Sequence, residues 1–203
     1  MSDPKLHAPA TQRNRDPIFA VLQRVLPPEG LVLETSSGSG EHATYMAPKL
    51  APRIWQPSDI DPAARASIAA YVADTGAENL LPPVELDVTW PDWPVAQAAA
   101  ILSVNMIHIA PWEACLGLLR GAARHLITGG RLVTYGPYRI DGRHTAPSNE
   151  AFDASLRGRD PSWGVRDLEA VAAEAHAVGL RLLERVAMPA NNFTVVFERT
   201  TTD

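Results

Sequence analysis

The chain has 203 residues, of which 46% are hydrophobic, and a formal net charge of −5. This length suits one well-buried core and is short for two, so we expect a single domain over residues 1–203. The negative charge, without a sustained run of Lys or Arg, argues against a nucleic-acid partner and favours a small-molecule substrate. With Cys115 as the one cysteine, and no apolar run typical of a signal peptide or a bilayer span, we expect a cytoplasmic protein without disulfides or a membrane partner.

The start of the chain shows little periodicity, so residues 1–16 are expected to form a loose arm. Apolar residues then recur at helical spacing over residues 18–26, with Asp16 as the expected N-cap and Pro17 at the first helical position. Two interpretations of Arg13 and Asn14 stay open. They form a solvated entry to the helix, or the arm folds over a ligand with an arginine paired to a carboxylate.

An apolar strand over residues 31–35 runs into a turn that contains Gly38 and Gly40, and a helix is expected over residues 41–50. Small residues at such a turn let the backbone approach a nucleotide-like ligand, because no Cβ holds the ligand away. The N-terminus of the helix would present free backbone N–H groups to the same ligand. Glu34 adds a carboxylate at the end of the strand.

A second strand is expected over residues 53–57, followed by a helix over residues 62–75. Asp61 is the expected N-cap of this helix, and Gly76 is expected to close it. Asp59 lies between this strand and this helix and has no evident structural role. It follows the glycine turn by about 20 residues, the separation at which an acid on the second strand reaches ribose hydroxyls.

A third short strand is expected over residues 83–88, with Asp87 near its end. Residues 98–104 are apolar apart from Ser103, as in a central parallel strand that is buried on both faces. A helix over residues 111–126 and a strand over residues 131–135 follow. This alternation of strand and helix predicts a parallel sheet with helices on both faces.

The pattern changes in the last third of the chain. Residues 136–160 are polar and lack clear periodicity, and their place after a strand is typical of a substrate lid; Tyr138 in this segment is expected to line a pocket. A helix is expected over residues 163–178. Strands over residues 180–186 and 193–198 are too closely spaced for a parallel crossover, so they are expected to form an antiparallel hairpin.

Together, these six strands, the carboxylate before the glycine turn, the acids after strands two and three, and the final hairpin resemble the class I S-adenosylmethionine-dependent methyltransferases. That family implies a Rossmann-like, seven-stranded, mostly parallel sheet with helices on both faces, and S-adenosyl-L-methionine as cofactor. Within this superfamily, four segments are similar to the methyltransferase-like 26 family, whose substrate is unassigned: residues 13–18, 55–61, 163–168 and 188–192.

The resemblance implies roles for individual residues. It places nine at the cofactor: Glu34, Gly38 and Gly40 at the methionine part, Asp59 at the ribose, Ile60, Asp87 and Val88 at the adenine, and Asn105 and Met106 at the methyl group. The substrate or lid candidates are Arg13, Asn14, Tyr138, Asn191 and Asn192. His108 follows the fourth strand and is either a hydrogen-bonded loop residue or the general base. We expect no metal ion.

Alternatives remain at this point. Residues 38–43 also match the Gly-x-Gly-x-x-Gly/Ala pattern of dinucleotide sites, so an NAD(P)-dependent oxidoreductase is one of them. Glu34, which precedes Gly38 with three residues between them, favours a ligand with an ammonium and a sulfonium instead. A non-catalytic protein that binds the cofactor and acts through a partner is the other alternative. Asp87 has a structural alternative as well, because aspartates often form turns.

Overall fold

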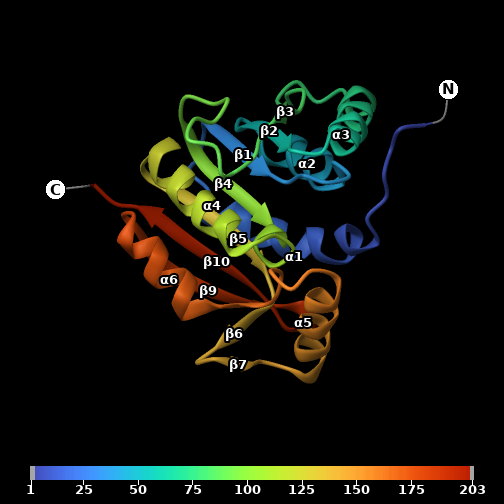
Figure 1. Cartoon of the computed structure of the whole chain (residues 1–203). Coiled ribbons are helices and arrows are strands. Elements are labelled where there is room, and N and C mark those ends of the chain that lie inside the picture. The colour runs from blue at the N-terminus through green and yellow to red at the C-terminus, as the bar shows by residue number, and fades with distance from the viewer. Residues whose placement is uncertain (1–2, 202–203) are drawn as a thin grey trace.

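The computed structural model describes residues 3–201. Its main element is a seven-stranded sheet with the strand order β3-β2-β1-β4-β5-β10-β9. The first five strands along the chain run parallel, and β10 is antiparallel to both β5 and β9 (Figure 1). The strands are β1 (Leu31–Thr35), β2 (Ile54–Asp59), β3 (Val84–Glu85), β4 (Ala98–Val104), β5 (Leu126–Gly136), β9 (Leu180–Met188) and β10 (Asn192–Arg199). The expected Rossmann-like fold class with a final hairpin is confirmed.

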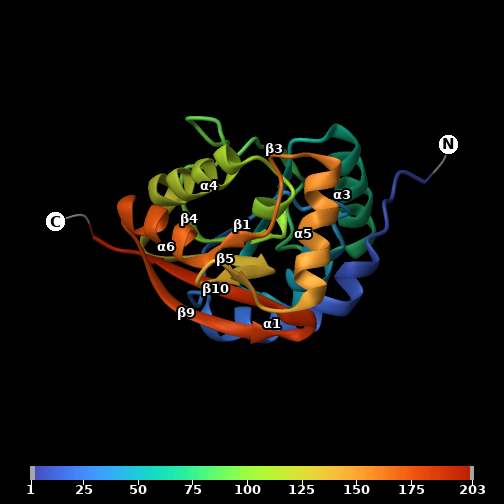
Figure 2. The same cartoon turned by 60° about the horizontal axis from the view of Figure 1, so that its bottom comes forward.

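Helices cover both faces of this sheet. They are α1 (Pro9–Val25), α2 (Glu41–Met46), α3 (Pro62–Thr75), α4 (Trp112–His125), α5 (Pro147–Arg159) and α6 (Leu168–Ala177), with short 3-10 turns η1 (Pro48–Leu50), η2 (Met106–His108) and η3 (Pro189–Asn191). Helices α4 and α6 lie side by side on one face, while α1 and α2 pack together on the other (Figures 1 and 2). None of the helices in residues 3–201 is long and apolar enough to cross a membrane.

The sheet separates two apolar cores, because successive side chains of a strand point to opposite faces. In β4, Ile101 packs into the core under α4 and α6, whereas Ala100 and Leu102 pack into the core under α1 and α2. Val195 and Val196 of β10 divide in the same way. This explains why every position of β4 except Ser103 is apolar.

The N-terminal segment differs from its prediction. Helix α1 begins at Pro9 and continues through Pro17, so the second half of the expected arm is helical; residues 1 and 2 of that arm lie outside the described chain. The segment before α1 is fastened by side chains from elsewhere. The Leu6 N–H donates to Ser67 Oγ at 2.8 Å, and the Ala8 N–H donates to Glu41 Oε2 at 2.7 Å. These contacts come from residues more than thirty positions away, so local periodicity could not reveal them.

The expected lid segment is also more regular than predicted. It contains the strands β6 (Tyr138–Ile140) and β7 (Arg143–His144), which form a second sheet with β8 (Arg166–Asp167), and then helix α5. The last helix, α6, begins at Leu168 rather than near residue 163, because the Asp167 side chain accepts the Ala170 N–H and caps the helix there. In both views α5 stands at the side of the main sheet (Figures 1 and 2).

Other boundaries follow the sequence closely. Asp61 caps α3 by accepting the Ala63 N–H at 2.8 Å, and Gly76 ends α3 in the left-handed conformation. Helix α2 stops at Met46 instead of continuing to residue 50, because Pro48 follows and begins the 3-10 turn η1. The third strand is another exception: β3 has two residues, whereas the sequence predicted a strand of six.

Candidate functional site

The carboxyl ends of β1, β2 and β4 meet at one edge of the sheet. The chain order reverses there, because β1 lies between β2 and β4, and ligands of open α/β sheets bind at such a reversal. Two cavities open at this edge, one of about 340 Å³ and one of about 500 Å³. Two consecutive residues after β4 contribute one wall residue to each cavity: Asn105 lines the larger cavity and Met106 lines the smaller one.

The smaller cavity has apolar walls and two acids. Its lining residues are Ser36, Ile60, Leu86, Asp87, Val88, Thr89, Met106, Ala110, Pro111, Glu113 and Ala114. Asp87 also forms a turn, because its Oδ1 accepts from both the N–H and the hydroxyl of Thr89 at 2.8 Å. The structural interpretation of Asp87 is therefore correct, and its place on the cavity wall adds to that interpretation.

Asp59, at the end of β2, holds the glycine turn. Its Oδ2 accepts the Gly38 N–H and its Oδ1 accepts the Asp61 N–H, each at 2.9 Å. The prediction that Asp59 lacks a structural role is thus wrong. A carboxylate offers about four acceptor positions, so two remain for a ligand beside these bonds.

The two glycines of the turn serve different purposes. A Cβ on Gly38 would meet no atom within 4 Å, so open space lies beside this residue. A Cβ on Gly40 would come within 2.9 Å of Ile68 Cα, and Gly40 has φ of +92°. Gly40 is therefore required for the close packing of α2 on α3, while its contact with a ligand through the backbone stays a prediction.

Glu34 lies beneath the turn instead of facing a cavity. Only 1% of the residue is exposed, and its Oε2 accepts the Trp55 indole N–H at 2.8 Å. Burial raises the pKa of Glu34 from about 4.5 to about 7, opposed by the hydrogen bond from Trp55. The expectation that Glu34 faces a cationic ligand group is corrected: its carboxylate ties β1 to β2 inside the fold.

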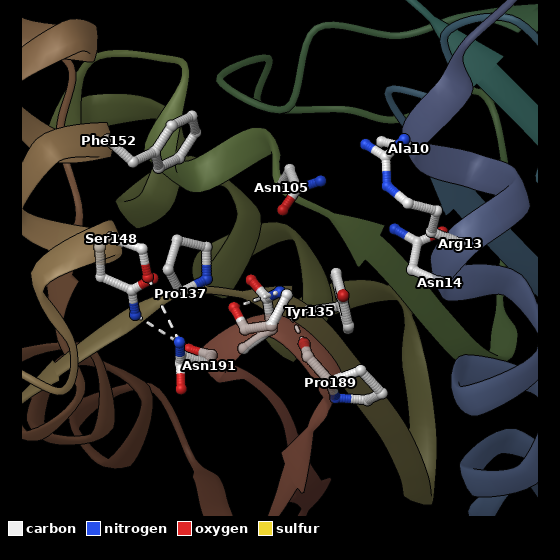
Figure 3. A pocket seen from close by; sticks show the side chains of 13 residues that line it. Ala10, Arg13, Asn14, Asn105, Tyr135, Pro137, Ser148, Phe152, Pro189 and Asn191 are labelled. Carbon is white, nitrogen blue, oxygen red and sulfur yellow. Dashed lines mark hydrogen bonds between the residues drawn. The ribbon is translucent and has the colours of Figure 1, made fainter.

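The larger cavity is formed by α1, the ends of β4 and β5, the start of α5 and the turn before β10 (Figure 3). Its lining residues are Ala10, Arg13, Asn14, Asn105, Tyr135, Pro137, Ser148, Asn149, Phe152, Pro189, Ala190, Asn191 and Asn192. Asparagines contribute five of these side chains, and Arg13 contributes the one permanent charge. The cavity thus joins segments that lie far apart in the sequence.

Amide groups fix the wall opposite α1. The buried Asn149 donates its Nδ2 to the Asn191 carbonyl at 2.9 Å and to Thr145 Oγ1 at 3.0 Å. Asn192 Nδ2 donates in turn to the carbonyls of Pro189 and Ala190. Helix α5 and the turn at residues 189–192 are therefore held together as one wall.

Asn14 occupies the α1 side of the cavity. His42 Nε2 lies 2.9 Å from Asn14 Oδ1, and because an amide oxygen only accepts, Nε2 carries the proton. Burial lowers the pKa of His42 to about 4, so this imidazole is neutral at pH 7. The Asn14 amide nitrogen is then directed to Tyr135, whose pKa is raised by burial and lowered less strongly by the hydrogen bond from Asn14.

His108 and Tyr138 lie inside the protein, outside both cavities. The two rings pack edge to face with centroids 5.0 Å apart, and neither residue is exposed. Burial lowers the pKa of His108 to about 3, and its Nδ1 accepts the Arg166 N–H at 3.3 Å. Tyr138 shares a hydrogen bond with Thr134. Of the two interpretations of His108, the structure favours the hydrogen-bonded residue over the general base. The expected pocket position of Tyr138 is corrected, because Tyr138 is a core residue and Tyr135 lines the cavity.

Residues with a strained backbone conformation are concentrated on the walls of the two cavities. Five residues other than glycine in the described chain have positive φ: Ser36, Asn105, Asp141, Ala190 and Asn191. Four of them line a cavity, and Asp141 is the exception. Such conformations cost on the order of 1 to 3 kcal/mol each and cluster at functional sites, which supports a binding role for this edge of the sheet.

Residues 5–199 match the family described as "Protein of unknown function (DUF938)". The chain belongs to this family. Its fold is also similar to solved structures of methyltransferases at low sequence identity. One is the S-adenosylmethionine-dependent methyltransferase SibL in its apo form, with 21% identity, a TM-score of 0.77, and coverage of 95% of this chain and 56% of that chain.

Two further structures share the fold. An O-methyltransferase family protein from Burkholderia thailandensis has 14% identity and a TM-score of 0.80, with 96% of this chain and 57% of that chain covered. A putative sarcosine dimethylglycine methyltransferase from Galdieria sulphuraria has 14% identity and a TM-score of 0.74, with 97% and 92% covered. The DUF938 chain thus spans little more than half the length of the first two and nearly all of the third.

The cavities divide the residues predicted for this DUF938 chain. Ile60, Asp87, Val88 and Met106 line the smaller cavity, while Arg13, Asn14, Asn105, Asn191 and Asn192 line the larger one. Glu34, Gly38, Gly40 and Asp59 support the turn between β1 and α2. Sequence reasoning missed the α5 contribution of Ser148, Asn149 and Phe152, since the polar composition of this helix hides its period.

Proposed function

We propose that this chain is an S-adenosylmethionine-dependent methyltransferase that acts on a small-molecule acceptor. The observation that carries the proposal is the pair of cavities at the carboxyl edge of the sheet, connected through Asn105 and Met106. One cavity suits a cofactor and the other an acceptor, and methyl transfer requires both within reach of each other. The similarity of the fold to methyltransferases supports the same function.

The smaller cavity and the turn beside it fit the parts of the cofactor. Ile60 and Val88 offer apolar walls to the adenine ring, and Asp87 offers an acceptor for its exocyclic amine. The two remaining acceptor positions of Asp59 suit the ribose hydroxyls. The open space beside Gly38 would let the backbone approach the ligand closely.

When bound, the cofactor supplies a methyl group that its sulfonium already activates. The task of the protein is then to hold the acceptor in line with this methyl group and to exclude water. Asn105 is placed to do so, since it lines the acceptor cavity next to Met106 on the cofactor side. Within residues 3–201, acid, histidine, lysine and cysteine side chains do not line the acceptor cavity. The Tyr135 phenol does, but burial raises its pKa, so it is protonated at pH 7 and does not act as a base. We therefore propose that the accepting atom is nucleophilic without a protein base.

The finer assignments belong to the same proposal. Residues 13–18, 55–61, 163–168 and 188–192 support a relationship to the methyltransferase-like 26 family, which brings no substrate with it. A cytoplasmic location is part of the proposal as well, supported by Cys115, a buried cysteine that forms no disulfide.

Calorimetry with S-adenosylhomocysteine and with NADH tests the choice of cofactor. We expect S-adenosylhomocysteine to bind, and Asp59→Asn to weaken its binding about tenfold or more, because a charge-assisted contact is lost. Asp61→Asn is the matched control: it removes the same charge two residues away, and asparagine caps a helix as well as aspartate does. Binding of NADH alone would overturn the proposal in favour of an oxidoreductase.

Activity needs its own measurement. Methyl transfer from cofactor labelled in its methyl group to a small-molecule extract distinguishes an enzyme from a silent cofactor-binding protein. We expect a labelled small-molecule product that disappears with Asp59→Asn. Cofactor binding without transfer in several extracts would favour the silent binder.

A further inference from the structure

The acceptor cavity carries a single, positive charge. Arg13 is the only lining residue with a permanent charge, and no aspartate or glutamate lines the cavity within the described chain. The Arg13 guanidinium makes no hydrogen bond or ion pair with any other residue in the range 3–201. A cation on the wall of a cavity, with no partner of its own, is available to an anionic ligand.

The neighbouring cavity has the opposite character. Asp87 and Glu113 line it, and no lysine or arginine among residues 3–201 does. The two halves of the site are thus polarised, with carboxylates on the proposed cofactor side and a guanidinium on the acceptor side. An anionic acceptor would be attracted to the second half and repelled by the first.

Helix α5 adds to the positive side. It begins at Pro147, so Ser148 and Asn149 of its first turn line the cavity beside the positive end of the helix dipole. Arg13 and Asn14 extend from α1 on the other side, toward Asn105 and Tyr135 (Figure 3). Arg13 and the positive end of the α5 dipole therefore lie on two sides of the same space, and Glu150, the acid in the first turn of α5, is exposed and does not line the cavity.

The remaining walls suit an organic body. Pro137, Phe152 and Pro189 line the cavity, and Phe152 is 40% exposed although it is a large apolar side chain. The volume of about 500 Å³ lies within the range of small-molecule sites. A bare inorganic ion would leave these apolar surfaces uncovered.

We propose, on the basis of the methyltransferase function proposed above, that the acceptor is a small organic carboxylate that pairs with Arg13. The planar guanidinium offers two parallel N–H donors, which match the two oxygens of a carboxylate. The apolar walls then contact the rest of the acceptor. A phosphate ester is the competing anion, and the wall offers no second cation for its additional charge.

The test uses matched pairs of probes that differ only in charge. Benzoate with benzamide, and indole-3-acetate with indole-3-acetamide, are titrated into the full chain saturated with S-adenosylhomocysteine, and binding is followed by ligand-observed NMR. We expect at least one carboxylate to bind about tenfold more tightly than its amide. Arg13→Gln should abolish this preference, and Arg13→Lys should keep part of it. Arg24→Gln is the control, because it removes the same charge from the far end of α1 and should keep the preference.

Three results would overturn the proposal: no carboxylate preference in either pair, a preference that survives Arg13→Gln, or tighter binding of phenyl phosphate than of benzoate. Thermal unfolding of Arg13→Gln checks that the exposed substitution leaves the fold intact. If S-adenosylhomocysteine binds and carboxylates do not, this inference fails and the proposed function stands. If S-adenosylhomocysteine fails to bind, the proposed function fails, and the Arg13-dependent preference is measured without it.

Discussion

Glu34 makes the stability of this protein depend on pH in an unusual direction. Its carboxyl group is buried, and its pKa is raised from about 4.5 to about 7 in the folded state. The folded protein therefore binds this proton more tightly than the unfolded chain does. The stability that belongs to the protonated form is complete below pH 4.5 and is lost as the pH rises through 7.

The size of the effect follows from the shift in pKa. One pKa unit corresponds to about 1.4 kcal/mol, so the shift of Glu34 amounts to about 3 kcal/mol between pH 4.5 and pH 8. Glu34→Gln replaces the carboxyl group by a neutral amide whose oxygen still accepts from Trp55. We expect this variant to gain stability relative to the natural protein by about 3 kcal/mol on going from pH 5 to pH 8.

Urea unfolding at pH 5 and pH 8 measures this difference. Groups other than Glu34 titrate in both proteins, so their contributions to stability cancel in the comparison between variant and natural protein. His42 is one of them: its pKa is lowered, so the stability that it contributes is lost as the pH falls from 6.5 through 4. Glu184→Gln is the control, because Glu184 lies at the surface in an ion pair with Arg24. An equal stability difference between Glu34→Gln and the natural protein at both pH values would refute the reasoning.

Three further predictions concern the backbone and the core. Gly40→Ala should lower the free energy of unfolding in urea by about 2 kcal/mol or more, because of the left-handed backbone and the contact with Ile68. Gly142→Ala is the control: Gly142 has φ of +71° and open space around it, so the loss should be only about 1 kcal/mol. Equal losses in the two variants would contradict the packing role of Gly40. Ala190→Gly should stabilise by about 1 kcal/mol, since it relieves a φ of +56°, and a lower unfolding midpoint would refute this. His108→Gln should lower stability by about 1 to 3 kcal/mol without changing the affinity for S-adenosylhomocysteine, and a selective loss of binding would return His108 to the site.

The sequence predicted the elements whose signal is local. The apolar run of residues 98–102 in β4 reflects two cores on the two sides of one sheet, and Asp61 and Gly76 mark the ends of α3. Helix α1 was misplaced because Pro17, which favours a first helical turn, lies inside it. The actual start depends on Glu41, which no local pattern connects to residue 8.

The sequence identified several residues that line the cavities, but it did not identify which residues are buried beneath the glycine turn. Residues next to strand ends, such as Ile60 and Met106, line a cavity, and their contact with a cofactor stays a prediction. Glu34 did not, because its orientation is set by the indole of Trp55, 21 positions away. Spacing along a chain therefore indicates which strand end carries a residue, while tertiary packing decides whether its side chain faces the ligand or the core.

A crystal structure of the complex with S-adenosylhomocysteine tests the central claim most directly. The account predicts the adenine between Ile60 and Val88, the ribose hydroxyls on Asp59, and the sulfur next to Asn105 at the border of the two cavities. Adenine in the larger cavity, or a ligand that leaves Asp59 without contact, would contradict it.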